Sequence, residues 1–170
     1  MNHLDLSVFV EFGVGLAGFS GVVVAFTKGS GRLGGYDQFR VVQLLVTALT
    51  PAFMGLLLTV LASFGIEGEL AWRAAGGVLG AALMANALLA VIHARALSET
   101  ARRSLSPTIW RLGLGSLAVL LLWNLLNLAG WPEPISLGPI AATMAWLLVL
   151  SSIMFFRLLL ARIDEDDRAR

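Results

Sequence analysis

The sequence contains no cysteine, two histidines, one tyrosine and few charged residues for its length of 170. Without cysteine, disulfide bonds, thiol catalysis and zinc–thiolate sites are excluded. Two histidines, His3 and His93, are too few for a histidine-rich metal site. Charged residues make up 14% of the chain, against roughly 25% in an ordinary soluble domain. This low share indicates that lipid rather than water surrounds much of the protein.

Several classes of function lack the residues that they need. The net charge of +1 provides no broad basic surface, so we expect no nucleic-acid partner. The segment from Lys28 to Arg32 is rich in glycine, but it follows an apolar run and lacks the spacing of a phosphate-binding loop. No Ser/His/Asp set, catalytic carboxylate pair or His–Glu metal motif is present. We therefore expect neither enzymatic activity nor a cofactor.

The chain has long apolar runs instead. Hydrophobic residues make up 58% of the sequence, and the mean hydropathy is +0.83. A helix needs about 20 apolar residues to cross the hydrocarbon core of a bilayer. The runs of suitable length are residues 4–26, 41–64, 70–92, 109–128 and 135–156. The sequence predicts an all-α integral membrane protein with five transmembrane helices in one domain over residues 1–170, and no separate soluble domain.

The basic residues predict the orientation of these helices. They cluster after the first, third and fifth runs: Lys28, Arg32, Arg40, Arg95, Arg102, Arg103, Arg111, Arg157, Arg162, Arg168 and Arg170. The opposite side carries Glu67, Glu69 and Glu133, with Arg73 as its one basic residue. Since basic loops stay in the cytoplasm, we expect the N-terminus outside and the C-terminus in the cytoplasm.

The first apolar run contains one carboxylate, Glu11, about 10 Å from the start of that helix at 1.5 Å of rise per residue. A charged group at this depth is costly and is usually held by a specific partner. Around the helix, Glu11 shares one stripe with Gly15 and Gly18, and Gly21 lies nearby. Small residues let membrane helices approach closely. We therefore expect Glu11 to point into a packed protein interior while the bulky face of this helix meets lipid.

Similar small residues, including Gly76 and Gly80, recur on the other helices. They are more numerous than one compact chain requires for packing, so we expect a homo-oligomer, although tight packing within one chain remains the alternative.

Other polar side chains fall into two layers of the expected bundle. An outer layer contains Asn124 and Asn127, at a depth similar to that of Glu11, and an inner layer contains Gln43, Asn86 and His93. One hypothesis is that Glu11 binds a proton or small cation, Asn124 and Asn127 help to coordinate it, and His93 guards the inner end of the path. The alternative is that these groups only join helices, because asparagines commonly do so in membranes.

Two functional hypotheses follow from these patterns. The first is a homo-oligomeric channel or transporter for a proton or small cation, centred on Glu11. The second is a membrane assembly or regulatory subunit that packs through its small-residue faces with another membrane protein. A further hypothesis is that Lys28, Arg32 and Arg40 bind the headgroup of an anionic lipid.

Two segments carry a resemblance to other sequences. Residues 17–25, AGFSGVVVA, and 36–40, YDQFR, resemble small uncharacterised bacterial inner-membrane proteins. The resemblance covers mainly the first quarter of the chain. It implies a multi-pass protein of the bacterial inner membrane and carries no activity or functional residue.

Overall fold

The computed structural model describes residues 7–28, 35–97, 99, 107–131 and 135–168. These residues form five helices, which are α1 (Ser7–Lys28), α2 (Gly35–Ser63), α3 (Glu69–Ala96), α5 (Pro107–Leu128) and α6 (Gly138–Arg168). The all-helical prediction is confirmed. Four of the helices are long and apolar enough to cross a membrane, with spans of 38–63, 69–96, 110–128 and 138–157. In α1 the apolar stretch within the searched residues is Ser7–Phe19, so a count of five spans stays a prediction.

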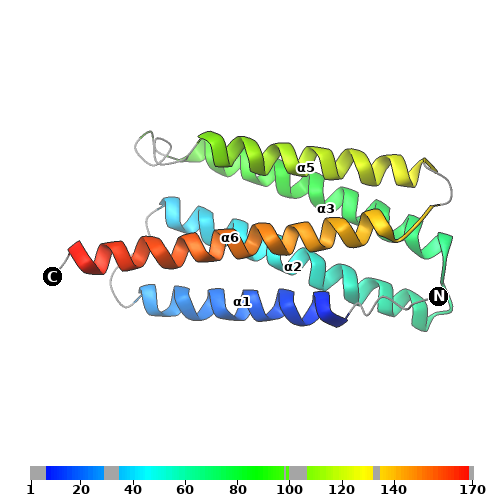
Figure 1. Ribbon diagram of the computed structural model, residues 1–170, viewed down its shortest axis with the longest axis horizontal. Coiled ribbons are helices and arrows are strands. Elements are labelled where there is room, and N and C mark those ends of the chain that lie inside the picture. Colours follow the sequence, from blue (N-terminus) through cyan, green and yellow to red (C-terminus); the bar gives the residue numbers. More distant parts are fainter. Residues whose placement is uncertain (1–6, 29–34, 98, 100–106, 132–134, 169–170) are drawn as a thin grey trace.

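Four helices form a closed bundle, and the fifth lies against its outside. Each of α2, α3, α5 and α6 packs on the next in that order, and α6 packs back on α2. Neighbours around this bundle run in opposite directions (Figure 1). α1 packs only on α2 and α6 among the helix pairs with extensive contact. It therefore covers one side of the bundle and leaves its own far side uncovered.

The core of the bundle is apolar. It contains Met54, Leu58, Ala75, Leu79, Leu83, Leu117, Leu120, Ile140, Met144 and Leu147. Phe9 of α1 packs against the edge of this cluster. The side chains from α2, α3, α5 and α6 thus meet in the middle of the bundle and exclude water from it.

Two glycines end helices at the same end of the bundle. Gly65 has φ +74° and Gly130 has φ +83°, a conformation that residues with a Cβ rarely adopt. After α2, Gly65 N–H donates to Ala62 O, and Ile66 N–H to Leu61 O. After α5, Gly130 N–H donates to Asn127 O, and Trp131 N–H to Leu126 O. Both helices end in Schellman motifs, which bind the last carbonyls and stop the helix.

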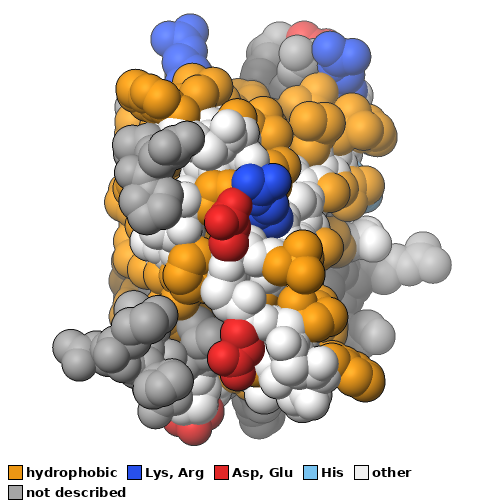
Figure 2. Space-filling model, turned by 90° about the vertical axis from the view of Figure 1, so that its right-hand side faces the viewer, with side chains coloured by type: hydrophobic (Ala, Val, Ile, Leu, Met, Phe, Trp, Pro, Cys, Tyr) orange, Lys and Arg blue, Asp and Glu red, His pale blue; other side chains and the backbone are white. Residues whose placement is uncertain are grey.

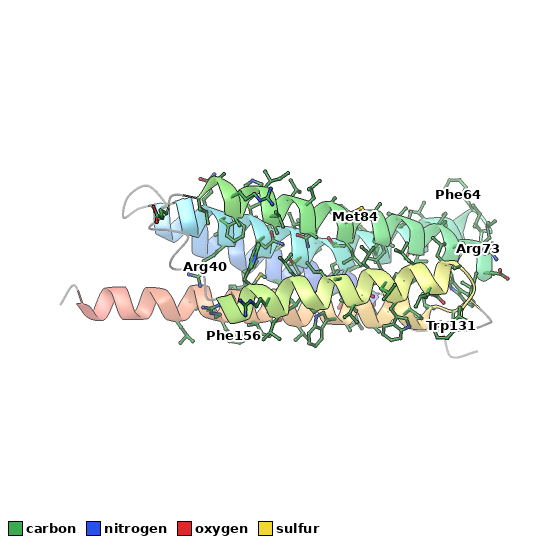
Figure 3. All side chains as sticks on the ribbon, turned by 90° about the horizontal axis from the view of Figure 1, so that it is seen from above. Arg40, Phe64, Arg73, Met84, Trp131 and Phe156 are labelled. Carbon is green, nitrogen blue, oxygen red and sulfur yellow. The ribbon has the colours of Figure 1, made fainter. Side chains whose placement is uncertain are left out.

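The two ends of the bundle differ in charge. Arg40 lies at one end, and Phe64, Arg73 and Trp131 lie at the other (Figure 3). At the second end the Arg73 guanidinium donates to Glu69 Oε1 at 2.7 Å, and both side chains are more than half exposed. Figure 2 faces this end, where a basic and an acidic side chain lie in contact among uncharged and apolar groups. The described part of the chain thus carries Arg40 at one end and the Glu69–Arg73 pair at the other, and its orientation in a membrane stays a prediction.

α6 extends farther than predicted. Its apolar span ends at Arg157, but the helix continues to Arg168 and extends past the other helices in Figure 1. Since a helix satisfies its own backbone hydrogen bonds, it does not have to stop where the apolar sequence stops. The predicted span boundaries describe the apolar runs better than they describe the helices.

Candidate functional site

The α1 helix docks on α2 through a stripe opposite to the predicted one. Gly13 is buried, and a Cβ built on it would lie 2.7 Å from Ala48 O and 3.1 Å from Ala52 Cβ. At this separation no side chain fits, so glycine is what allows the two backbones to approach. Phe9, one turn earlier, packs at the edge of the core. The contact face of α1 is therefore the stripe through Phe9 and Gly13.

The prediction that Glu11 points into the packed interior is wrong for the single chain. Glu11 is exposed, and so are Gly15, Gly18 and Gly21. A Cβ built on any of these three glycines would have no neighbour within 4 Å. At 100° per residue, Glu11 lies about 200° around the helix from Gly13, which is almost the opposite side. Small residues occur on most faces of α1. Among the described ones, Gly13 is buried against α2, whereas Gly15 and Gly18 are exposed.

The contact at Gly13 also fixes the depth of Glu11. Ala48 and Ala52 lie on either side of the midpoint of the apolar span 38–63. Glu11 precedes Gly13 by two residues, which is about 3 Å along the helix axis. Figure 1 agrees, because α1 begins well inside the end where α2 turns into α3. The carboxylate therefore lies near the middle of the α2 span, deeper than the outer third predicted from the sequence.

The two asparagines of α5 do not join Glu11 within one chain. Asn124 is 1% exposed and faces α6, where its Nδ2 donates to Thr143 Oγ1 at 2.7 Å. Asn127 Nδ2 donates to Ser136 O at 3.1 Å, and Ser136 N–H donates to Asn127 Oδ1 at 3.2 Å. This pair ties the end of α5 to the segment before α6. Both asparagines use their amides to hold α5 and α6 together.

Two of the three inner polar residues meet. Gln43 Nε2 of α2 donates to Asn86 Oδ1 of α3, and Asn86 is 3% exposed. One turn farther along α2, Thr47 Oγ1 donates to Gln43 O at 2.7 Å. His93 is exposed, and its Nδ1 lies 2.8 Å from Leu89 O of its own helix. The inner layer is therefore an α2–α3 hydrogen bond, and His93 takes no part in it.

The remaining predicted residues divide into two groups. Gly76 and Gly80 of α3 are buried, the first towards Ile140 of α6 and the second towards Leu121 of α5. The side chain of Lys28 and the whole of Arg32 lie outside the described residues, and Arg40 is half-buried at the start of α2. The predicted lipid site therefore falls largely outside the described residues and stays a prediction.

Sequence reasoning counts Gly13 among the small residues of α1 but does not single it out as the docking residue, because several other glycines, alanines and serines lie on the same helix. Periodicity alone does not say which of them meets α2. Thr143 was also missed as the partner of Asn124, because a threonine in an apolar helix usually bonds its own backbone.

Among the residues that the structure describes, no three His, Asp or Glu side chains gather as ligands for a metal ion. The one ionisable group near the middle of the described spans is Glu11, on the outward face of α1. No protein-family model matches the chain, and comparison with curated proteins and with solved structures finds no significant similarity.

Proposed function

We propose that this protein forms a homo-oligomer in a membrane and conducts a proton or a small cation, with Glu11 as the group that binds it. The observation that carries the proposal is an exposed carboxylate near the middle of an apolar span, on the side of α1 that no other described helix of the chain covers. Ionisable residues at this depth usually face protein or a water-filled path and mark routes for ions or protons.

Contact with lipid is an unfavourable environment for this side chain. An acidic side chain at the centre of a membrane helix raises the free energy of insertion by about 2.5–3.5 kcal/mol. Contact with a second protein surface removes most of this penalty. Gly15 and Gly18 favour such a contact, because their missing side chains let a neighbouring helix approach Glu11 closely.

A second copy of the chain is the neighbour that fits best. If identical chains pack around α1 with closed symmetry, their Glu11 side chains meet at one depth and form a ring. Rings of acidic side chains select cations in channels. The route then runs between chains, which agrees with the apolar packing inside the bundle. Asn124 and Asn127 would hold the α5–α6 pair and leave ion binding to Glu11.

Ion flux into proteoliposomes tests this proposal. Under an imposed pH or potassium gradient, we expect flux from the wild type and loss of flux from Glu11→Gln, which keeps the shape of the side chain but not its charge. Glu69→Gln makes the same chemical change at the exposed end of the bundle and should leave flux intact. Flux that survives Glu11→Gln in a folded, assembled protein would refute the role of Glu11.

The second candidate function is that of an assembly or regulatory subunit. The same exposed face of α1 supports it, because another membrane protein covering Gly15 and Gly18 would also shield Glu11. This function predicts that a different polypeptide co-purifies in fixed stoichiometry after gentle extraction. A pure homo-oligomer would argue against it.

The cellular setting is part of the same proposal. We place the protein in the bacterial inner membrane with its basic end in the cytoplasm, supported by the described Arg40, Arg95, Arg111 and Arg157 at one end of the helices. Lys28, Arg32 and Arg40 remain candidates for holding an anionic lipid headgroup at that end. Retained lipids, identified by mass spectrometry in the wild type and in Arg32→Gln/Arg40→Gln, would test this role.

A further inference from the structure

One buried polar atom of the bundle has no partner. Asn124 Oδ1 is fully buried and accepts no hydrogen bond from any described residue. Asn124 itself is 1% exposed and lies one turn from Leu120 of the apolar core. Buried carbonyl oxygens in proteins nearly always receive a hydrogen bond, so an exception requires an explanation.

The orientation of the amide is fixed by its neighbours. Nδ2 donates both of its hydrogens, one to Leu120 O at 2.8 Å and one to Thr143 Oγ1 at 2.7 Å. The hydroxyl of Thr143 donates its own hydrogen to Pro139 O at 2.8 Å, so its oxygen can only accept from Asn124. Turning the amide over would direct Oδ1 towards the acceptor Leu120 O, and Thr143 could donate to it only by giving up its bond to Pro139 O. The local hydrogen bonds therefore determine which atom of the Asn124 amide is Oδ1 and which is Nδ2, and they leave Oδ1 as the unpartnered one.

The surrounding helices offer no donor for this oxygen. Backbone N–H groups in the middle of α5 and α6 are used within the helices. The nearby core side chains, Leu120, Ile140 and Met144, have no hydrogen to donate. Within the described residues, Asn124 Oδ1 is therefore left without a donor.

α3 presents two buried glycines, which have no side chain, towards residues of α5 and α6 that lie one turn from this pair. A methyl group added at Gly80 would approach only Leu121 Cδ1, at 3.8 Å, and one at Gly76 only Ile140 Cδ1, at 4.0 Å. Both are ordinary van der Waals contacts. Leu121 lies one turn from Asn124, and Ile140 one turn from Thr143, so the two glycines are close to the pair at the meeting of α3, α5 and α6.

We propose that a single buried water molecule donates a hydrogen bond to Asn124 Oδ1. Its second partner is the remaining lone pair of Thr143 Oγ1. Buried waters typically join polar groups that the protein leaves unsatisfied and are costly to remove. This water lies within one chain, so the inference stands independently of ion conduction through Glu11.

Polarisation transfer from water to the side-chain amide of Asn124, measured by NMR on the full chain in nanodiscs, tests the proposal. We expect a water cross-peak for Asn124 in the wild type and its loss in Gly80→Ala, whose added methyl group would occupy the side-chain-free space beside Leu121, one turn from Asn124. Gly77→Ala places the same methyl group on the exposed side of α3, where nothing lies within 4 Å, and should keep the cross-peak.

The exposed amide of Gln38 serves as the positive control in the same spectrum. A water cross-peak for Gln38 but none for Asn124 in the wild type would overturn the proposal. So would a cross-peak for Asn124 that Gly80→Ala and Gly77→Ala leave equally strong, because water would then reach the amide by another side.

Discussion

At the scale of single residues, hydrogen bonds from side-chain amides connect neighbouring elements of the bundle. Asn127 illustrates this, because its side chain donates to and accepts from the backbone of Ser136. Asn127→Ala should lower the free energy of unfolding by about 1–3 kcal/mol, since it leaves two half-buried backbone groups of Ser136 without their partner. Reversible unfolding in mixed micelles would measure this difference.

Ser152→Ala is the matched control for Asn127→Ala. The Ser152 hydroxyl donates to Leu148 O within its own helix, at 2.8 Å, so its removal breaks no contact between helices. We expect a change close to zero for this variant. Equal losses from the two variants would contradict the role assigned to Asn127.

The Gln43–Asn86 pair gives a second prediction at this scale. Gln43→Leu and Asn86→Leu should each destabilise the protein, because each leaves one buried polar group unpaired. The double variant removes both groups and should recover much of the loss, with a coupling of about 0.6–2 kcal/mol. A double-mutant cycle on the same unfolding assay measures it. Additive losses would show that the two side chains do not act as a pair.

At the scale of helices, the attachment of α1 to the bundle depends on Gly13. Gly13→Ala forces a Cβ to within 2.7 Å of Ala48 O, a backbone atom that cannot move alone, so α1 must shift away from α2. The chain has no natural cysteine, so spin labels at Val8→Cys and Phe53→Cys, both exposed, report on this helix pair when labelled chains are diluted with unlabelled ones. We expect a longer or broader distance distribution in Gly13→Ala.

Gly15→Ala separates this effect from the intrinsic influence of alanine on a helix. It has no neighbour within 4 Å, so the α1–α2 distance should not change. If Gly13→Ala left the distances as they are in Gly15→Ala, the close contact at Gly13 would be refuted.

At the scale of helices, the sequence predicts which segments are helical better than it predicts which helix faces are in contact. The apolar runs predicted five helices, and Pro107 stands at the first position of the fourth of them, where proline is favoured. The face of α1 that meets α2 was predicted wrongly, since size alone made Gly13 and Gly15 equivalent. Only the position of Ala48 on the partner helix distinguishes them. Which face of α1 packs on α2 depends on the residues of both helices, so the periodicity of α1 alone does not predict it.

At the scale of the whole molecule, the structure is a self-contained bundle with one peripheral helix. α2, α3, α5 and α6 close on an apolar core, whereas α1 leaves Glu11, Gly15, Gly18 and Gly21 uncovered. The sequence indicated that the acid belongs beside small residues, and this remains the basis of the proposed function. What the sequence did not indicate is that a single chain leaves this stripe on its outside.

The central claim of the proposed function is that α1 meets α1 of another copy around Glu11. Gly18→Cys provides a single thiol on this face, and cross-linking in isolated membranes tests the contact directly. We expect a covalent dimer of the chain, while Val119→Cys, which is 66% exposed on α5, should stay monomeric. A product joining Gly18→Cys to a different polypeptide would favour the subunit function. No product from Gly18→Cys, or the same yield from Val119→Cys, would contradict the claim.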